Sequence, residues 1–151
     1  MYRVLLPVDE SEPRARAQAT VVRDLPGATT DVSVDVLHVR EGESGTDAEW
    51  AAGGFTEEYA AEMERVTDDE ALPESVEAAV DVLDASDLKW TIRTATGDPA
   101  ATILEAAAEY DSDVIVIGVQ NRSPVGKVLF GSVAQAVILD SERPVTVVPA
   151  T

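Results

Sequence analysis

The chain has 151 residues, a length that suits one α/β domain over 1–151, and 45% of them are hydrophobic, so a real core can form and general disorder is excluded. Cysteine is absent, which excludes disulfides and thiolate chemistry. The 29 acidic residues against 11 basic ones give a formal charge of −18, which argues against nucleic acid or an anionic membrane as a partner.

The acid excess coincides with a scarcity of lysine, of which there are only Lys89 and Lys127. Self-repulsion of this size is costly in dilute salt, whereas molar salt shortens the screening length to about 3 Å. We therefore expect a halophilic protein; the alternative is an acidic protein from an ordinary cell. No apolar run approaches the roughly 18 residues of a membrane span, and the N-terminus shows no signal-peptide pattern, so we expect a cytoplasmic protein with no membrane partner.

The first half of the chain alternates strand and helix signals. A β-branched apolar run predicts a strand over 3–8, and Asp9 to Pro13 carries the signals of a helix start. That helix is expected to run to about Asp24. A second strand is predicted over 32–39, a loop over 40–55 and a helix over 56–66.

The second half repeats the alternation. Pro73 is expected to open a helix with apolar residues at helical spacing, and a strand follows over 88–96. Asp98 is a predicted N-cap with proline in the first turn of the next helix. The strongest strand signal covers 113–118, a helix is predicted over 132–140, and the last strand over 144–148.

The order β-α-β-α-β-α-β-α-β predicts an α/β fold with an open parallel sheet and helices on both faces. Ligands of such sheets bind beyond the carboxyl ends of the strands, near the point where the strand order reverses. The sequence therefore predicts one crevice lined by Pro7, Asp9, Val39 and Gly118.

The segment from Gly118 to Val133 joins a buried strand to a helix. A helix N-terminus offers unpaired N–H groups and a positive dipole end, which suit a phosphate. Gly131 permits close approach of an anion, Ser132 offers a hydroxyl, and Arg122 and Lys127 add positive charge. The Gly126–Lys127 pair does not make a Walker A motif, because Val128 follows it and the earlier glycine is missing.

The 26 residues from Val114 to Leu139 contain no acid, where this composition would place about five. Either this stretch serves an anionic ligand, or it is acid-free because it holds a buried strand and a core-facing helix.

Four patterns together resemble the universal stress protein family. The loop matches the family signature G-x-x-G, nine residues, G-[S/T], through Gly118, position 121, Gly131 and Ser132. The opening run from Leu5 to Ser11, the Leu37–Val39 strand end and the closing 143–148 run are also similar to the family. The resemblance covers the chain except for 40–72.

The resemblance implies an adenine-nucleotide alpha hydrolase-like fold with five parallel strands in the order 3-2-1-4-5. It implies an ATP-binding regulatory module of the stress response and a homodimer formed through the last strand, Pro144 to Pro149. We expect Mg²⁺ beside the nucleotide, because Mg²⁺ needs few protein ligands and uses phosphate oxygens. Asp9 matches the position that meets the ribose. The other implied or candidate nucleotide-binding residues are Pro7, Val39 and Ile117 near the base or sugar, and Gly118, Gln120, Asn121, Arg122, Gly126, Lys127, Gly131, Ser132 and Val133 around the phosphates.

One position departs from the signature, since Asn121 stands where the family has its second glycine. Asparagine tolerates left-handed backbone geometry better than other non-glycine residues, but its side chain either crowds the phosphates or donates to them. No nucleophile, base and orienting group can be assembled, so we predict no enzyme. Two alternatives stay open: a nucleotide-free dimeric interaction module, and a slow ATP-hydrolysing or adenylyl-transferring enzyme.

Overall fold

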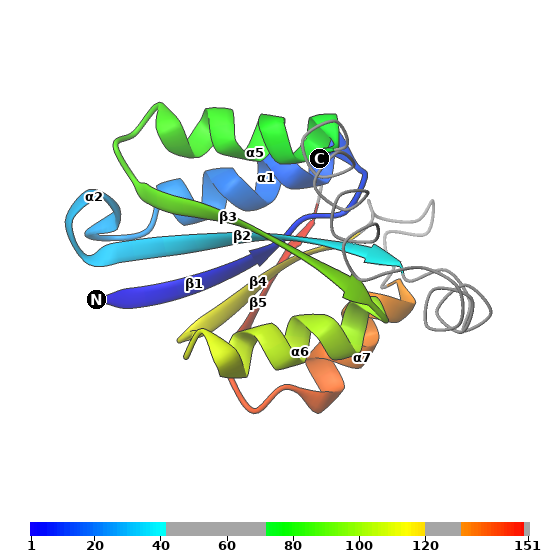
Figure 1. Cartoon of the computed structure of the whole chain (residues 1–151). Helices are drawn as coiled ribbons and strands as arrows, with labels where there is room; N and C mark the ends of the chain where they lie inside the picture. Colours follow the sequence, from blue (N-terminus) through cyan, green and yellow to red (C-terminus); the bar gives the residue numbers. More distant parts are fainter. Residues whose placement is uncertain (42–71, 120–130, 150–151) are drawn as a thin grey trace, which may run out of the picture.

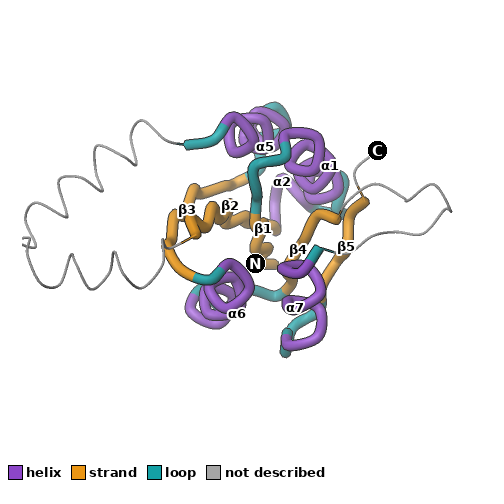
Figure 2. The backbone as a smooth tube through the Cα atoms, turned by 90° about the vertical axis from the view of Figure 1, so that its right-hand side faces the viewer, coloured by secondary structure: helices purple, strands orange, loops and turns teal. Residues whose placement is uncertain are grey.

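The computed structural model describes residues 1–41, 72–119 and 131–149. Its centre is a five-stranded parallel sheet with the order β3-β2-β1-β4-β5. This order confirms the predicted 3-2-1-4-5 arrangement. Figure 1 shows helices above and below the sheet, and Figure 2 shows the three layers from the side.

The element bounds follow the predicted alternation closely. The strands are β1 (Tyr2–Pro7), β2 (Val32–Glu41), β3 (Lys89–Gly97), β4 (Val114–Val119) and β5 (Val145–Pro149). The helices are α1 (Glu12–Arg23), α2 (Ala28–Asp31), α5 (Glu74–Asp84), α6 (Pro99–Glu109) and α7 (Ser132–Asp140). The short helix α2 was not predicted, because four residues are too few to show a helical period. The helix expected over 56–66 lies outside the described residues.

Two helix starts confirm their sequence signals. Ser11 caps α1 by accepting from the Arg14 N–H at 3.4 Å, and Asp98 caps α6 by accepting from the Ala101 N–H at 3.0 Å. Both helices have proline in the first turn, where its missing N–H costs nothing. These caps fix where each helix leaves the sheet.

The sheet buries apolar side chains on both faces, as expected when helices cover both sides of a parallel sheet. On the α1 and α5 face the core includes Val4, Leu6, Val34 and Val116. On the α6 and α7 face it includes Leu5, Leu37, Ile115 and Ile117, packed against Ile103 and Val137. The strand with the strongest sequence signal, β4, has five of its six residues buried.

The neighbouring strands β1 and β4 separate toward their carboxyl ends. Their register pairs Val4 with Val114 and Leu5 with Ile115, and the described ladder contains no later pair. In contrast, β1 stays paired with β2 as far as Pro7 and Leu37. The helices that follow β1 and β4 lie on opposite faces, so this is the point where ligands of open α/β sheets bind.

None of the helices in the described ranges is both long enough and apolar enough to cross a membrane.

Candidate functional site

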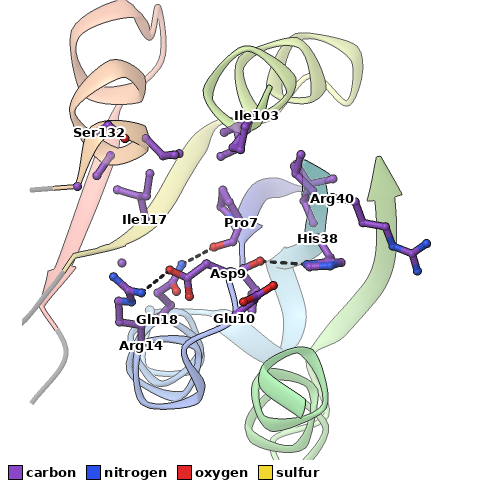
Figure 3. Close-up of a pocket in the computed structure, with 18 residues that line it drawn as sticks. Pro7, Asp9, Glu10, Arg14, Gln18, His38, Arg40, Ile103, Ile117 and Ser132 are labelled. Carbon is purple, nitrogen blue, oxygen red and sulfur yellow. Dashed lines mark hydrogen bonds and ion pairs between the residues drawn. The ribbon is translucent and has the colours of Figure 1, made fainter. Parts of the chain in front are cut away.

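A crevice of about 680 Å³ opens at the carboxyl ends of β1, β2 and β4. Figure 3 shows Asp9 and Arg14 on one side and Ser132 and Ile103 on the other. Apolar side chains of Pro7, Val39, Ile103 and Ile117 line part of its wall. The volume falls in the range of small-molecule sites, which combine apolar walls with a few polar groups.

The structure brings together eight of the residues singled out in the sequence. These are Pro7, Asp9, Val39, Ile117, Gly118, Gly131, Ser132 and Val133, and all of them line the crevice. The other five candidates, Gln120, Asn121, Arg122, Gly126 and Lys127, lie outside the described residues. The assignment of all thirteen to nucleotide binding stays a prediction.

The Asp9 carboxylate projects into this crevice with half of its side-chain surface exposed. Its Oδ1 accepts from the Ser11 N–H at 2.8 Å, and its Oδ2 lies 2.8 Å from Arg14 Nη2. Ser11, rather than Asp9, is the N-cap of α1. Each carboxylate oxygen has two acceptor sites, so Asp9 can still accept hydrogen bonds from a ligand hydroxyl.

The first turn of α7 forms the opposite wall. Gly131 is its N-cap, and the first intrahelical bond runs from the Gln135 N–H to the Gly131 carbonyl at 3.0 Å. The N–H groups of Ser132, Val133 and Ala134 therefore have no acceptor within the helix. Together with the helix dipole they suit an anion, and a Cβ built on Gly131 meets no atom of the described residues within 4 Å.

Gln18 supports the crevice from below. Its Nε2 donates to the Pro7 carbonyl of β1 at 2.7 Å and to the Val116 carbonyl of β4 at 3.0 Å. The residue is 1% exposed. Its amide thus bridges the two strands just beyond the point where their own ladder ends.

Sequence reasoning missed several lining residues, including Gln18, Arg14, Arg40 and Ile103. Gln18 carried a readable signal, because it interrupts the otherwise apolar buried face of α1 formed by Ala15, Ala19 and Val22. Arg14 and Arg40 carried none, since surface arginines are common on helices and after strands. His38, the single histidine of the sequence, is 7% exposed, with Nδ1 3.5 Å from the Val8 carbonyl.

The charges of the described lining are balanced. The lining includes two acids, Asp9 and Glu10, and two arginines, Arg14 and Arg40, in a chain with 29 acids and 11 basic residues; Figure 3 shows the Arg40 side chain directed away from Asp9. The crevice is therefore far less repulsive to an anion than the chain as a whole. No cluster of three potential metal-ligating side chains occurs within 1–41, 72–119 and 131–149.

Comparison with known proteins agrees with this geometry. A model of the universal stress protein family matches residues 1–149. A universal stress protein of Mycolicibacterium smegmatis is 29% identical over 118 residues, which are 78% of this chain and 76% of that relative.

Two solved structures of universal stress protein from Archaeoglobus fulgidus are also similar. One has 26% identity, a TM-score of 0.69 and 98% coverage of both chains. The other, described as a complex with dAMP, has 23% identity, a TM-score of 0.65 and the same coverage. Because the family model spans nearly the whole sequence, this chain belongs to the universal stress protein family.

Proposed function

We propose that this protein is an adenine-nucleotide-binding regulatory module of the stress response, with ATP as its ligand. The observation that carries the proposal is the crevice in which the Asp9 carboxylate and the free first turn of α7 form opposite walls. A carboxylate recognises sugar hydroxyls and a helix N-terminus recognises phosphate. A ligand that contains both groups, joined to a flat apolar base, is a nucleotide.

The three parts of a nucleotide have matching surfaces in the crevice. The side chains of Val39, Pro7 and Ile117 provide an apolar wall for the base. We assign the Asp9 carboxylate to the ribose hydroxyls and the N–H groups of residues 132–134 to a phosphate; the Asp9 exposure and the helix start of α7 support these roles. The dAMP complex of the Archaeoglobus fulgidus protein supports the same ligand class on the same fold.

Mg²⁺ is proposed to accompany the nucleotide rather than to occupy a protein cage. Within the crevice the described carboxylates are Asp9 and Glu10 alone. Mg²⁺ keeps several waters and binds phosphate oxygens with one or two carboxylates, so this sparse set fits an ion carried by the nucleotide. The protein would hold the ligand without turning it over, because the described lining supplies no nucleophile with an adjacent base.

We also propose a cytoplasmic homodimer formed through the last strand, Pro144 to Pro149. In the sheet order β5 follows β4 and ends the row, so its other edge has no partner strand among the described ones. Edge strands pair readily with a second copy of themselves. The charge of −18 suits a salt-rich cytoplasm. The same edge of β5 favours the alternative function, which is a dimeric interaction module that binds no nucleotide.

Thermal unfolding in molar KCl, with and without Mg-ATP, tests the nucleotide proposal. A ligand at about 100 times its Kd adds about 2.7 kcal/mol to the free energy of unfolding and raises the midpoint by several degrees. The matched variant Asn121→Gly restores the family signature. A shift in both proteins supports the proposal, and a shift only in the variant means that Asn121 closes the phosphate site. If neither protein shifts, the nucleotide-free dimer is the better account.

A further inference from the structure

The crevice contains a charged side chain whose hydrogen-bonding capacity is largely unused. Arg14 of α1 lines the crevice with 25% of its side chain exposed, and its Nη2 lies 2.8 Å from Asp9 Oδ2. Its Nε is buried without a hydrogen-bond partner. A guanidinium has five N–H donors in a rigid fork, so Arg14 can hold Asp9 and a second anion together.

Helical spacing places Arg14 at the point where β1 and β4 separate. Arg14 lies one turn before Gln18, on the same side of α1. Gln18 contacts the carbonyls of both strands there, and Figure 3 shows Arg14 beside Asp9 and Gln18. The guanidinium therefore lies on the β1 and β4 side of the crevice, across from the first turn of α7.

An anionic ligand meets an unfavourable charge at this place. Asp9 reaches toward the sugar position, so a phosphate on the same sugar passes close to its carboxylate. Like charges at such distances repel strongly in a partly desolvated cleft. The ion pair with Arg14 neutralises the carboxylate, while the remaining donors can contact a phosphate directly.

We propose that Arg14 is a specificity-determining residue that makes the affinity of the crevice depend on the phosphate groups of the nucleotide. This inference rests on the proposed function, because it assigns a role within the same site. Arg14 discriminates ATP, ADP and AMP from adenosine, and it does so by direct contact with a phosphate as well as by neutralising Asp9.

The test compares binding of adenosine, AMP, ADP and ATP by calorimetry in molar KCl, with Mg²⁺ present throughout. The variant is Arg14→Gln, and the matched control is Arg16→Gln, which removes the same charge from an exposed arginine paired with Glu12 at 3.2 Å. Molar salt screens charges beyond about 3 Å, so a loss that persists there comes from direct contact.

For Arg14→Gln we expect a loss of about tenfold in ATP affinity, the equivalent of one charged hydrogen bond, and a change within about twofold for adenosine. Arg14→Lys is expected to recover part of the loss, and Arg16→Gln to bind all four compounds like the wild type. Equal losses for ATP and adenosine would overturn the inference, because Arg14 would then act only by holding Asp9. Unchanged ATP binding in Arg14→Gln would also overturn it. If the wild type binds none of the four compounds, the proposed function fails first, which separates the two failures.

Discussion

Gly118 of β4 and Gln18 of α1 lie so close that a side chain on the glycine has no room. A Cβ built on Gly118 would lie 2.8 Å from Gln18 Oε1 and 3.0 Å from its Cδ. Gln18 cannot easily yield, because it is 1% exposed and its amide is bonded to both β1 and β4. The first glycine of the signature thus has a packing role in this chain, next to its predicted phosphate role.

Gly118→Ala is expected to lower the free energy of unfolding by about 1–3 kcal/mol, the usual cost of overpacking a core. Chemical denaturation of the wild type, Gly118→Ala, Gln18→Ala and the double variant measures the effect. Because Gln18→Ala removes the clashing atoms, the double variant should lose less stability than the two single variants together. Strict additivity would show that the two residues do not interact as described.

Gln18→Leu is expected to destabilise the protein by about 1–3 kcal/mol, because the Pro7 and Val116 carbonyls lose a buried donor. Gln135→Leu is the matched control, since Gln135 is exposed on α7. The free energy of unfolding of Gln135→Leu should stay within about 1 kcal/mol of the wild-type value. An equal loss in both variants would mean that the bridge between β1 and β4 contributes nothing specific.

Stability should rise steeply with salt. The charge of −18 repels itself in dilute buffer, and molar KCl screens that repulsion. We expect the thermal midpoint to increase from about 0.1 M to 2 M KCl, and to increase much less with an uncharged osmolyte of equal osmolality. A flat salt response would contradict the proposed adaptation to a salt-rich cytoplasm and favour an ordinary acidic protein.

The proposed homodimer can be tested by cross-linking, because the chain has no cysteine. Thr146→Cys places a single thiol at an exposed position of β5, next to its central residue, and Thr91→Cys places one at an exposed position of β3, the opposite edge of the sheet. Antiparallel pairing of β5 with a second copy brings two Thr146→Cys thiols close to the two-fold axis. A short bis-maleimide should then link Thr146→Cys into dimers and leave Thr91→Cys monomeric. Equal yields from both variants, with a monomer in sedimentation, would contradict the dimer.

The fold was predictable because its signals are local. The apolar run of β4, the Asp98 cap and the alternation of strands and helices are each contained in a few neighbouring residues, and together they leave few topologies. The strand order itself came from the family resemblance. Element ends shifted by one or two residues, as at β1, where register with β2 rather than hydrophobicity sets the limits.

The site was predictable only in part. The carboxyl ends of the strands indicated Pro7, Asp9, Val39 and Gly118, since parallel strands end on the same edge. The bond from Gln18 to Val116 spans 98 positions, and the pair between Arg14 and Asp9 depends on the direction of one side chain. Neither contact leaves a periodic trace in the sequence. Asn121 lies outside the described residues, and the variant Asn121→Gly tests its effect on phosphate binding.

The most direct test of the account places a carboxylate where the phosphate is proposed to bind. Gly131 has φ of −70°, a conformation open to any residue, and a Cβ there meets none of the residues that the structure describes within 4 Å. Gly131→Asp therefore keeps a favourable N-cap for α7, while its charge occupies the free N–H groups of the first turn.

Thermal unfolding of the wild type, Gly131→Asp and the neutral control Gly131→Asn is measured in molar KCl with and without Mg-ATP. Without ligand, the unfolding midpoint of Gly131→Asp should be at least as high as that of the wild type. With Mg-ATP, the midpoint should rise by several degrees in the wild type, by less in Gly131→Asn, and not at all in Gly131→Asp. An equal rise in wild type and Gly131→Asp would show that the phosphates do not bind at the first turn of α7, which would contradict the central claim.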